Sequence, residues 1–156
     1  MSVRAKICGI NSRAALDAAV AGGASHLGFN FYPPSPRALG DEAARALSLA
    51  VPTGVVKVGL LVNEPDDVID RILRAVPLDM LQLHGDETPE RVAAIKRRFG
   101  IAAMKALKVR AAADIDRAAA YEPVADWLMF DTLPPAAMKN ALPGGSTSNG
   151  FVKNAT

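Results

Sequence analysis

Two side chains that can exchange protons with a substrate stand in short apolar runs near opposite ends of the chain. Cys8, the only cysteine, lies in residues 6–10 (KICGI), and Asp131 lies in residues 128–132 (LMFDT). In α/β folds the loops that follow the strands build the active site. A thiol on one such loop and a carboxylate on another predict proton transfer to and from one small substrate.

Both residues also have a purely structural interpretation. A free cysteine is often a small buried hydrophobic residue. A thiol that acts as a base must ionise, which a nearby cation favours, and Lys6 on the same strand face is the candidate. Asp131 could instead cap a helix or end a turn. However, residues 132–135 (TLPP) carry no helix pattern, and a carboxylate beside apolar residues is suited to act as a general acid.

Two more residues are candidates for substrate binding. Arg37 follows three prolines in residues 31–37 (FYPPSPR), so the loop that presents its guanidinium to a carboxylate or phosphate is stiff. Its alternative is a surface arginine on a rigid turn. His84 ends the run LQLH (81–84) and is otherwise a satisfied histidine at a strand end. The spacing of His26, His84 and Cys8 does not match a zinc site, and no G-x-S-x-G motif is present.

The elements that must position these residues alternate between two patterns. Short β-rich runs and Ala-rich runs with helical periodicity follow one another, which predicts βαβ units and a parallel sheet. Ser12, Asp41 and Thr88 are candidate helix N-caps, and Gly100 is a stop signal. The predicted strands are 3–8, 25–31, 55–62, 79–84, 101–108 and 125–131, and the predicted helices are 12–22, 41–50, 65–76, 88–99 and 111–121.

Six such units leave two architectures open, an open doubly wound sheet and an incomplete (β/α)₈ barrel. No G-x-G-x-x-G motif follows the first strand, as a dinucleotide-binding sheet would require. Polar residues also recur inside strands with a period of two: Lys6 with Cys8, and Gln82 with His84. A barrel lumen near its open end can accommodate such residues better than a sheet covered on both faces. We therefore predict the barrel.

Composition restricts the class of protein. The chain has 156 residues, half of them apolar, and a net charge of +2, which gives no reason to expect a nucleic acid or a membrane surface as partner. A single cysteine favours a reducing compartment, and no run has the length of a membrane span or the pattern of a signal peptide. We expect a cytoplasmic protein.

The motifs together resemble one family, the phosphoribosylanthranilate isomerases of tryptophan biosynthesis. The resemblance extends from residue 3 to about residue 145. Each matching run is modestly specific alone, but their order and their spacing in a barrel are specific together. The runs are KICGI (6–10), LGFNFYPPSPR (27–37), KVGLLVN (57–63), LQLHGDE (81–87) and FDT (130–132).

The resemblance implies a TIM barrel that needs no cofactor or metal. It also implies an Amadori rearrangement, which converts N-(5-phosphoribosyl)anthranilate into 1-(2-carboxyphenylamino)-1-deoxyribulose 5-phosphate. Matched by motif, Cys8 resembles the general base and Asp131 the general acid. Arg37 resembles the residue that receives the anthranilate carboxylate, and His84 is assigned to substrate binding.

The resemblance ends after Gly145. The family continues with two more β/α units, whose loops hold the substrate phosphate, whereas residues 146–156 (STSNGFVKNAT) do not match it. We expect a partial barrel domain at 1–145 and a divergent loop or disordered tail at 146–156. Unpaired edges on the first and sixth strands would then promote self-association. Two alternatives remain open: a catalytically impaired fragment, and a doubly wound module that binds a phosphate or nucleotide.

Overall fold

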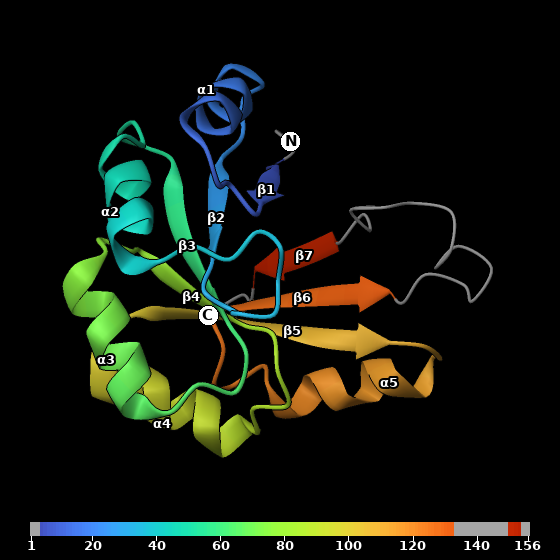
Figure 1. Ribbon diagram of the computed structural model, residues 1–156. Helices are drawn as coiled ribbons and strands as arrows, with labels where there is room; N and C mark the ends of the chain where they lie inside the picture. The colour runs from blue at the N-terminus through green and yellow to red at the C-terminus, as the bar shows by residue number, and fades with distance from the viewer. Residues whose placement is uncertain (1–3, 133–149, 154–156) are drawn as a thin grey trace.

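The sheet follows the order of the chain. The computed structural model describes residues 4–132 and 150–153, and its strands are arranged β1-β2-β3-β4-β5-β6-β7 (Figure 1). The first six are parallel and the last is antiparallel to β6. The strands are β1 (Lys6–Cys8), β2 (His26–Asn30), β3 (Val56–Leu61), β4 (Met80–Leu83), β5 (Ala102–Val109), β6 (Trp127–Thr132) and β7 (Gly150–Lys153).

This strand order decides between the two predicted architectures. Each parallel strand lies beside the strand that precedes it in sequence, as in a barrel, whereas a doubly wound sheet reverses its order. The doubly wound alternative is therefore wrong, and the chain forms an incomplete (β/α)₈ barrel. The connecting helices are α1 (Arg13–Ala21), α2 (Asp41–Leu49), α3 (Asp66–Ala75), α4 (Pro89–Phe99) and α5 (Ala113–Asp116), the last continued by the 3₁₀ helix η1 (Arg117–Ala120).

Local signals place the helix ends. The side chains of Ser12 and Thr88 accept hydrogen bonds from backbone N–H groups three residues later, as predicted for N-caps. Gly100 ends α4 in the left-handed conformation that glycine favours. The cap predicted at Asp41 is wrong, because Gly40 holds that position and Asp41 is the first helical residue, where its charge still favours the helix dipole.

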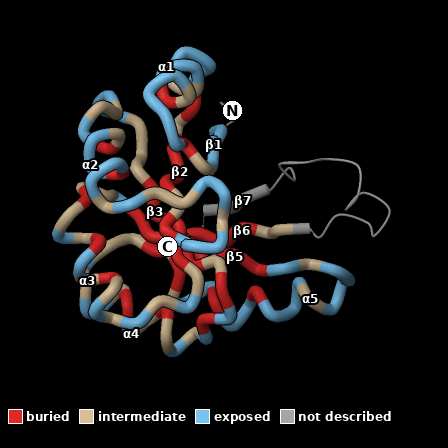
Figure 2. Tube along the Cα trace, viewed as in Figure 1, coloured by how far each residue is buried: buried red, intermediate tan, exposed pale blue. Residues whose placement is uncertain are grey.

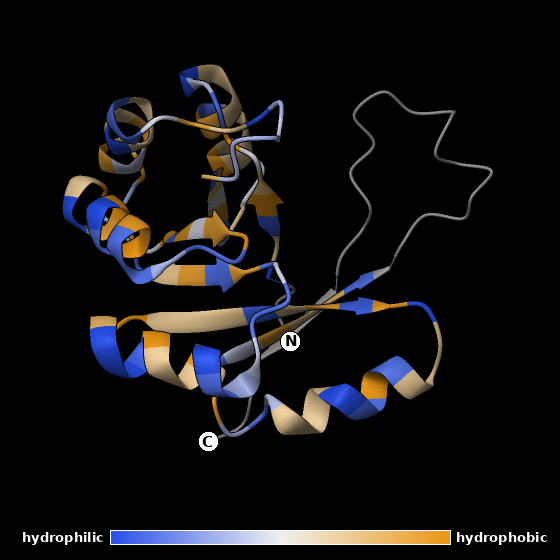
Figure 3. Ribbon diagram, turned by 60° about the horizontal axis from the view of Figure 1, so that its bottom comes forward, coloured by the Kyte–Doolittle hydropathy of each residue, from blue (hydrophilic) through white to orange (hydrophobic). Residues whose placement is uncertain are grey.

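Two apolar clusters cover the two faces of the sheet. The larger one fills the space between the strands and α1–α4, and includes Leu16, Leu27 and Ile69 (Figure 2). Hydrophobic and hydrophilic residues alternate along these helices (Figure 3), so each helix turns an apolar stripe to the sheet. The smaller cluster lies on the concave face and consists of Val58, Met80, Met104, Ala106, Trp127 and Met129.

The end of the chain differs from the expected loop. Gly150–Lys153 form β7, which pairs with β6 from Trp127 to Phe130. The expectation of an unpaired sixth strand is therefore wrong, since β6 has neighbours on both sides. β1 pairs only with β2 among the described residues, as an edge strand does. The expected domain boundary at residue 145 lies outside the described residues.

Candidate active site

The strand register places Cys8 on the concave face. Cys8 lies opposite Gly28, which lies opposite Val58, a member of the concave cluster. A Cβ atom on Gly28 would stand 3.1 Å from both the Cys8 Sγ and the Lys6 Nζ, so these two side chains are neighbours above a glycine that leaves room for them. Cys8 is exposed, which excludes its alternative as a buried hydrophobic residue.

Arg37 returns from the proline-rich loop to the end of β1. Its Nη1 lies 3.4 Å from the backbone carbonyl oxygen of Cys8. Gly9 has φ +82°, and a Cβ there would stand 2.7 Å from the Arg37 Cδ, so only a glycine lets the guanidinium lie so close. The backbone of this loop is fixed by Asn30 and Ser35, whose side chains hydrogen-bond each other at 2.9 Å. The exposed guanidinium is thus held beside the backbone of Cys8.

Asp131 lies on the same concave face at the other end of the parallel sheet. It shares the strand parity of Trp127 and Met129, both in the concave cluster. Its Oδ2 lies 3.1 Å from the Nε2 of His84, and both side chains are about one-fifth exposed. Asp131 belongs to β6 and binds the side chain of His84, which directly follows β4, so its alternative as a helix cap does not apply.

Gln82 completes a chain of three polar side chains. Its Nε2 lies 2.7 Å from the His84 Nδ1, and its Oε1 is buried with no hydrogen-bond partner among the described residues. When the amide donates to Nδ1, the ring carries its proton on Nε2 and donates it to Asp131. If the amide is rotated by 180°, its oxygen accepts from a protonated Nδ1, and Nε2 can then accept a hydrogen bond from a carboxylic acid O–H.

Burial keeps the imidazole neutral. It lowers the pKa of His84 below the usual 6.5, the adjacent Asp131 carboxylate opposes this, and the charges of Lys105 and Lys6 lower the pKa further. In a neutral ring one nitrogen donates a hydrogen bond and the other accepts one. The ring therefore exchanges hydrogen bonds with Asp131 without adding a fixed positive charge beside it.

A cavity of about 370 Å³ lies at the mouth of the partial barrel. The loop after β2 lines one side through Tyr32 and Ser35, and His84 and Lys108 line the other. It therefore adjoins both the loop that carries Arg37 and the histidine that binds Asp131. Its size suits a small-molecule ligand. No group of three or more His, Cys, Asp or Glu side chains in the described part of the chain could hold a metal ion.

Sequence reasoning missed three charged residues near this mouth. Lys105 and Glu87 are almost fully buried and form an ion pair, and Lys108 lines the cavity. A lysine inside the apolar run of β5 was the available signal, since an unpaired ammonium is costly to bury. Within residues 4–132 and 150–153, no helix has the length and apolar character needed to cross a membrane.

Comparison with known proteins agrees with this architecture. The family model for N-(5'phosphoribosyl)anthranilate (PRA) isomerase matches residues 5–148. The chain belongs to this family. An N-(5'-phosphoribosyl)anthranilate isomerase of Rhodospirillum centenum is 55% identical over 94% of this chain and 68% of its own length. One of Parvibaculum lavamentivorans is 47% identical over 97% of this chain and 69% of its own length.

Solved structures of phosphoribosylanthranilate isomerases share the fold. The Thermotoga maritima structure is 37% identical, with a TM-score of 0.79, over 86% of this chain and 64% of its own. A second structure, in complex with reduced 1-(o-carboxyphenylamino)-1-deoxyribulose 5-phosphate, is 36% identical, with a TM-score of 0.78, over 88% of this chain and 69% of its own. The chain thus spans about two thirds of the length of its isomerase relatives.

Proposed function

We propose that this chain carries the acid–base machinery of phosphoribosylanthranilate isomerase, in tryptophan biosynthesis in the cytoplasm. The substrate is N-(5-phosphoribosyl)anthranilate and the product is 1-(2-carboxyphenylamino)-1-deoxyribulose 5-phosphate. The observation that supports this best is the concave face of the sheet, where a cysteine beside an arginine and an aspartate bound to a histidine stand at the carboxyl ends of parallel strands.

The reaction needs one proton delivered and one removed. Asp131 gives its proton to the ribose ring oxygen, the bond from that oxygen to C1′ breaks, and the nitrogen lone pair forms a Schiff base. The Cys8 thiolate then takes the proton from C2′, which yields an enolamine, and tautomerisation gives the ketone. Two groups from opposite sides of the mouth suffice for these transfers.

The surroundings of each group match its role. Lys6 and Arg37 bring two positive side chains to the Cys8 end of the sheet, where a thiolate and a substrate carboxylate would both carry negative charge. Arg37 can bind the anthranilate carboxylate in two hydrogen bonds while the ribose lies toward β6. At the other end, neutral His84 holds Asp131 through a single hydrogen bond and can accept or donate as the proton moves.

The edge of β1 supports a second proposal, self-association. Ile7 is 44% exposed, and the outer edge of β1 has no partner strand among the described residues. Unpaired backbone N–H and C=O groups on such an edge favour pairing with another chain. Light scattering of the purified protein tests this: a species larger than a monomer is expected, and a monomer at every concentration would contradict it.

Turnover tests the proposed function. Conversion of N-(5-phosphoribosyl)anthranilate is followed by fluorescence for the wild type, Cys8→Ala, Asp131→Asn and the control Arg13→Ala, which changes only an exposed pair on α1. Loss of conversion in the first two variants, with Arg13→Ala unchanged, is expected. A wild-type chain without activity would favour the impaired-fragment alternative, and activity that survives both substitutions would overturn the assignment of Cys8 and Asp131.

A further inference from the structure

An ion pair lies buried on the far side of the sheet from the proposed acid. Lys105 Nζ and Glu87 Oε2 are 2.7 Å apart, and their side chains are 2% and 3% exposed. Lys105 belongs to β5 but faces the helix layer rather than the concave face, because its strand neighbours Met104 and Ala106 are in the concave cluster. None of the proton transfers proposed above uses this pair.

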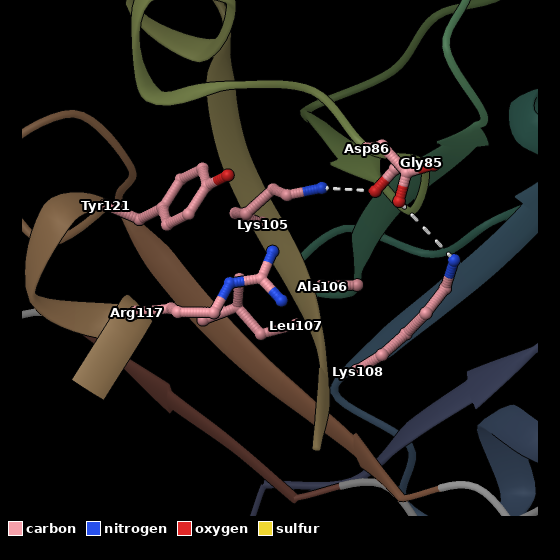
Figure 4. Close-up of a pocket in the computed structure, with 8 residues that line it drawn as sticks. All are labelled: Gly85, Asp86, Lys105, Ala106, Leu107, Lys108, Arg117 and Tyr121. Carbon is pink, nitrogen blue, oxygen red and sulfur yellow. Dashed lines mark hydrogen bonds and ion pairs between the residues drawn. The ribbon is translucent and has the colours of Figure 1, made fainter. Parts of the chain in front are cut away.

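The ammonium of Lys105 also holds the main chain on both sides of His84. It donates to the carbonyl oxygen of Gly85 at 2.7 Å (Figure 4). It also donates to the carbonyl oxygen of Leu83 at 3.3 Å. With Glu87, these contacts use all three ammonium protons. Leu83 and Gly85 are the residues immediately before and after the histidine that binds Asp131, so the backbone position of His84 depends directly on this cation.

Glu87 also binds the backbone of the β4–α4 loop. Its Oε1 accepts hydrogen bonds from the backbone N–H of Asn63 at 2.8 Å and of Gly85 at 3.2 Å. The hydroxyl of Tyr121 donates to the backbone carbonyl oxygen of Glu87 at 2.9 Å. The pair therefore ties the loops after β3 and β4 to β5 and to the segment after η1.

We propose that Lys105 and Glu87 are positioning residues, which fix the β4–α4 loop so that His84 reaches Asp131. A buried ion pair contributes little net stability compared with apolar residues of similar volume, so stability alone does not explain its presence here. Charge-assisted hydrogen bonds to defined backbone atoms do fix geometry. The inference rests on the proposed function only where it gives Asp131 the role of acid.

Nuclear magnetic resonance can read the position of His84 without any turnover. The chain has two histidines, and His26 lies on β2, where it packs edge-to-face against Trp127. Imidazole ¹⁵N shifts report which nitrogen carries the proton, and a titration reports the pKa. His26 therefore serves as an internal reference in the same sample.

The test compares two double variants with the wild type. Lys105→Met/Glu87→Gln removes both charges and the hydrogen bonds from Lys105 to the carbonyl oxygens of Leu83 and Gly85. Lys96→Met/Asp126→Asn removes a more exposed ion pair of 3.0 Å on the outer layer and is the matched control. In the wild type and the control, we expect neutral His84 to show one tautomer. In the first variant, we expect a mixture of tautomers and a pKa that rises toward 6.5, while His26 is unchanged.

The tautomer is the decisive reading. Asp131, Lys105 and Lys6 all act on the pKa of His84, so loss of the Lys105 charge raises that pKa even if the ring stays in place. A single tautomer in Lys105→Met/Glu87→Gln would overturn the proposal. If that variant does not fold, Lys105→Met alone gives the same test, because it removes both hydrogen bonds to the carbonyl oxygens of Leu83 and Gly85. A mixture of tautomers supports the proposal, and an unchanged spectrum contradicts it.

Discussion

The two ends of the parallel sheet hold their reactive groups in different ways. Cys8 ends a three-residue edge strand and is exposed, with cationic neighbours on its own strand and on a loop. Asp131 belongs to a six-residue strand paired on both sides, is about one-fifth exposed, and binds a neutral histidine. The proposed base is therefore exposed beside two cationic side chains, whereas the proposed acid is mostly buried and bound to an imidazole.

The difference also extends to what fixes each group. The position of Cys8 depends on the proline-rich loop that carries Arg37 and, among the described residues, on the pairing of β1 with β2 alone. The Asp131 end depends on the register of β4, β5 and β6, and on the Lys105–Glu87 pair beneath them. We therefore expect the acid end to be rigid and the base end to respond more readily to substitution.

The largest effects are expected from the two proton-transfer groups themselves. Cys8→Ala and Asp131→Asn should each lower kcat by about 10² to 10⁴, because each removes one acid–base step. Both variants keep side chains of similar or smaller size, so circular dichroism should show an unchanged fold. If Cys8→Ala leaves kcat unchanged, the thiol is not the general base, and only the role of Asp131 as acid remains.

A smaller effect, on binding rather than chemistry, is expected at Arg37. Loss of a charge-assisted hydrogen bond to the anthranilate carboxylate costs about 1.5–3 kcal/mol, which corresponds to a rise in KM of roughly 10-fold to 150-fold. Steady-state kinetics of Arg37→Ala should show this rise with kcat nearly unchanged. An equal fall in kcat with no change in KM would place the guanidinium in the transition state instead.

Stability should fall in mild acid. Burial lowers the pKa of both His84 and His26 in the folded chain, so below pH 6.5 the unfolded chain binds protons that the folded chain does not. The free energy of unfolding is therefore highest above pH 6.5 and decreases as the pH falls toward the lower folded pKa values. Urea unfolding at pH 7.5 and 5.5 measures this loss. In His84→Gln it should be smaller, and an equal loss would assign the effect elsewhere.

The smallest effects are expected at two helix caps, one beside each end of the site. Ser12→Ala and Thr88→Ala should each cost about 1 kcal/mol of unfolding free energy, since each leaves a backbone N–H without its side-chain acceptor. Ser12 follows β1, so its loss should also speed the reaction of Cys8 with a thiol reagent. Thr88→Ala should not, and Thr53→Ala, at an exposed turn, is the control for both measurements.

Much of the fold follows from local sequence signals. The run predicted as a strand at 55–62 is β3 (Val56–Leu61), and the helix predicted at 88–99 is α4 (Pro89–Phe99). The period-two pattern also correctly grouped Lys6 with Cys8 on the concave face, beside the apolar cluster. The helix predicted at 111–121 divides into a short α-helix and a 3₁₀ turn, a distinction that hydrophobic periodicity does not resolve.

The contacts that organise the site could not be predicted in the same way. The His84–Asp131 hydrogen bond joins residues 47 apart, and the Lys105–Glu87 pair joins residues 18 apart on different elements. Such pairings depend on the register and curvature of the whole sheet, which no local pattern encodes. Pairing of β7 with β6 depends likewise on which strand edge is available.

A crystal structure of the protein with the reduced product analogue, which one solved relative holds, would test the assignment of Cys8 as base and Asp131 as acid. We expect Cys8 Sγ beside C2′, the Asp131 carboxyl beside the oxygen that closes the ribose ring in the substrate, and the Arg37 guanidinium on the aryl carboxylate. An analogue bound with both Cys8 and Asp131 out of reach of the sugar carbons and oxygens would contradict it.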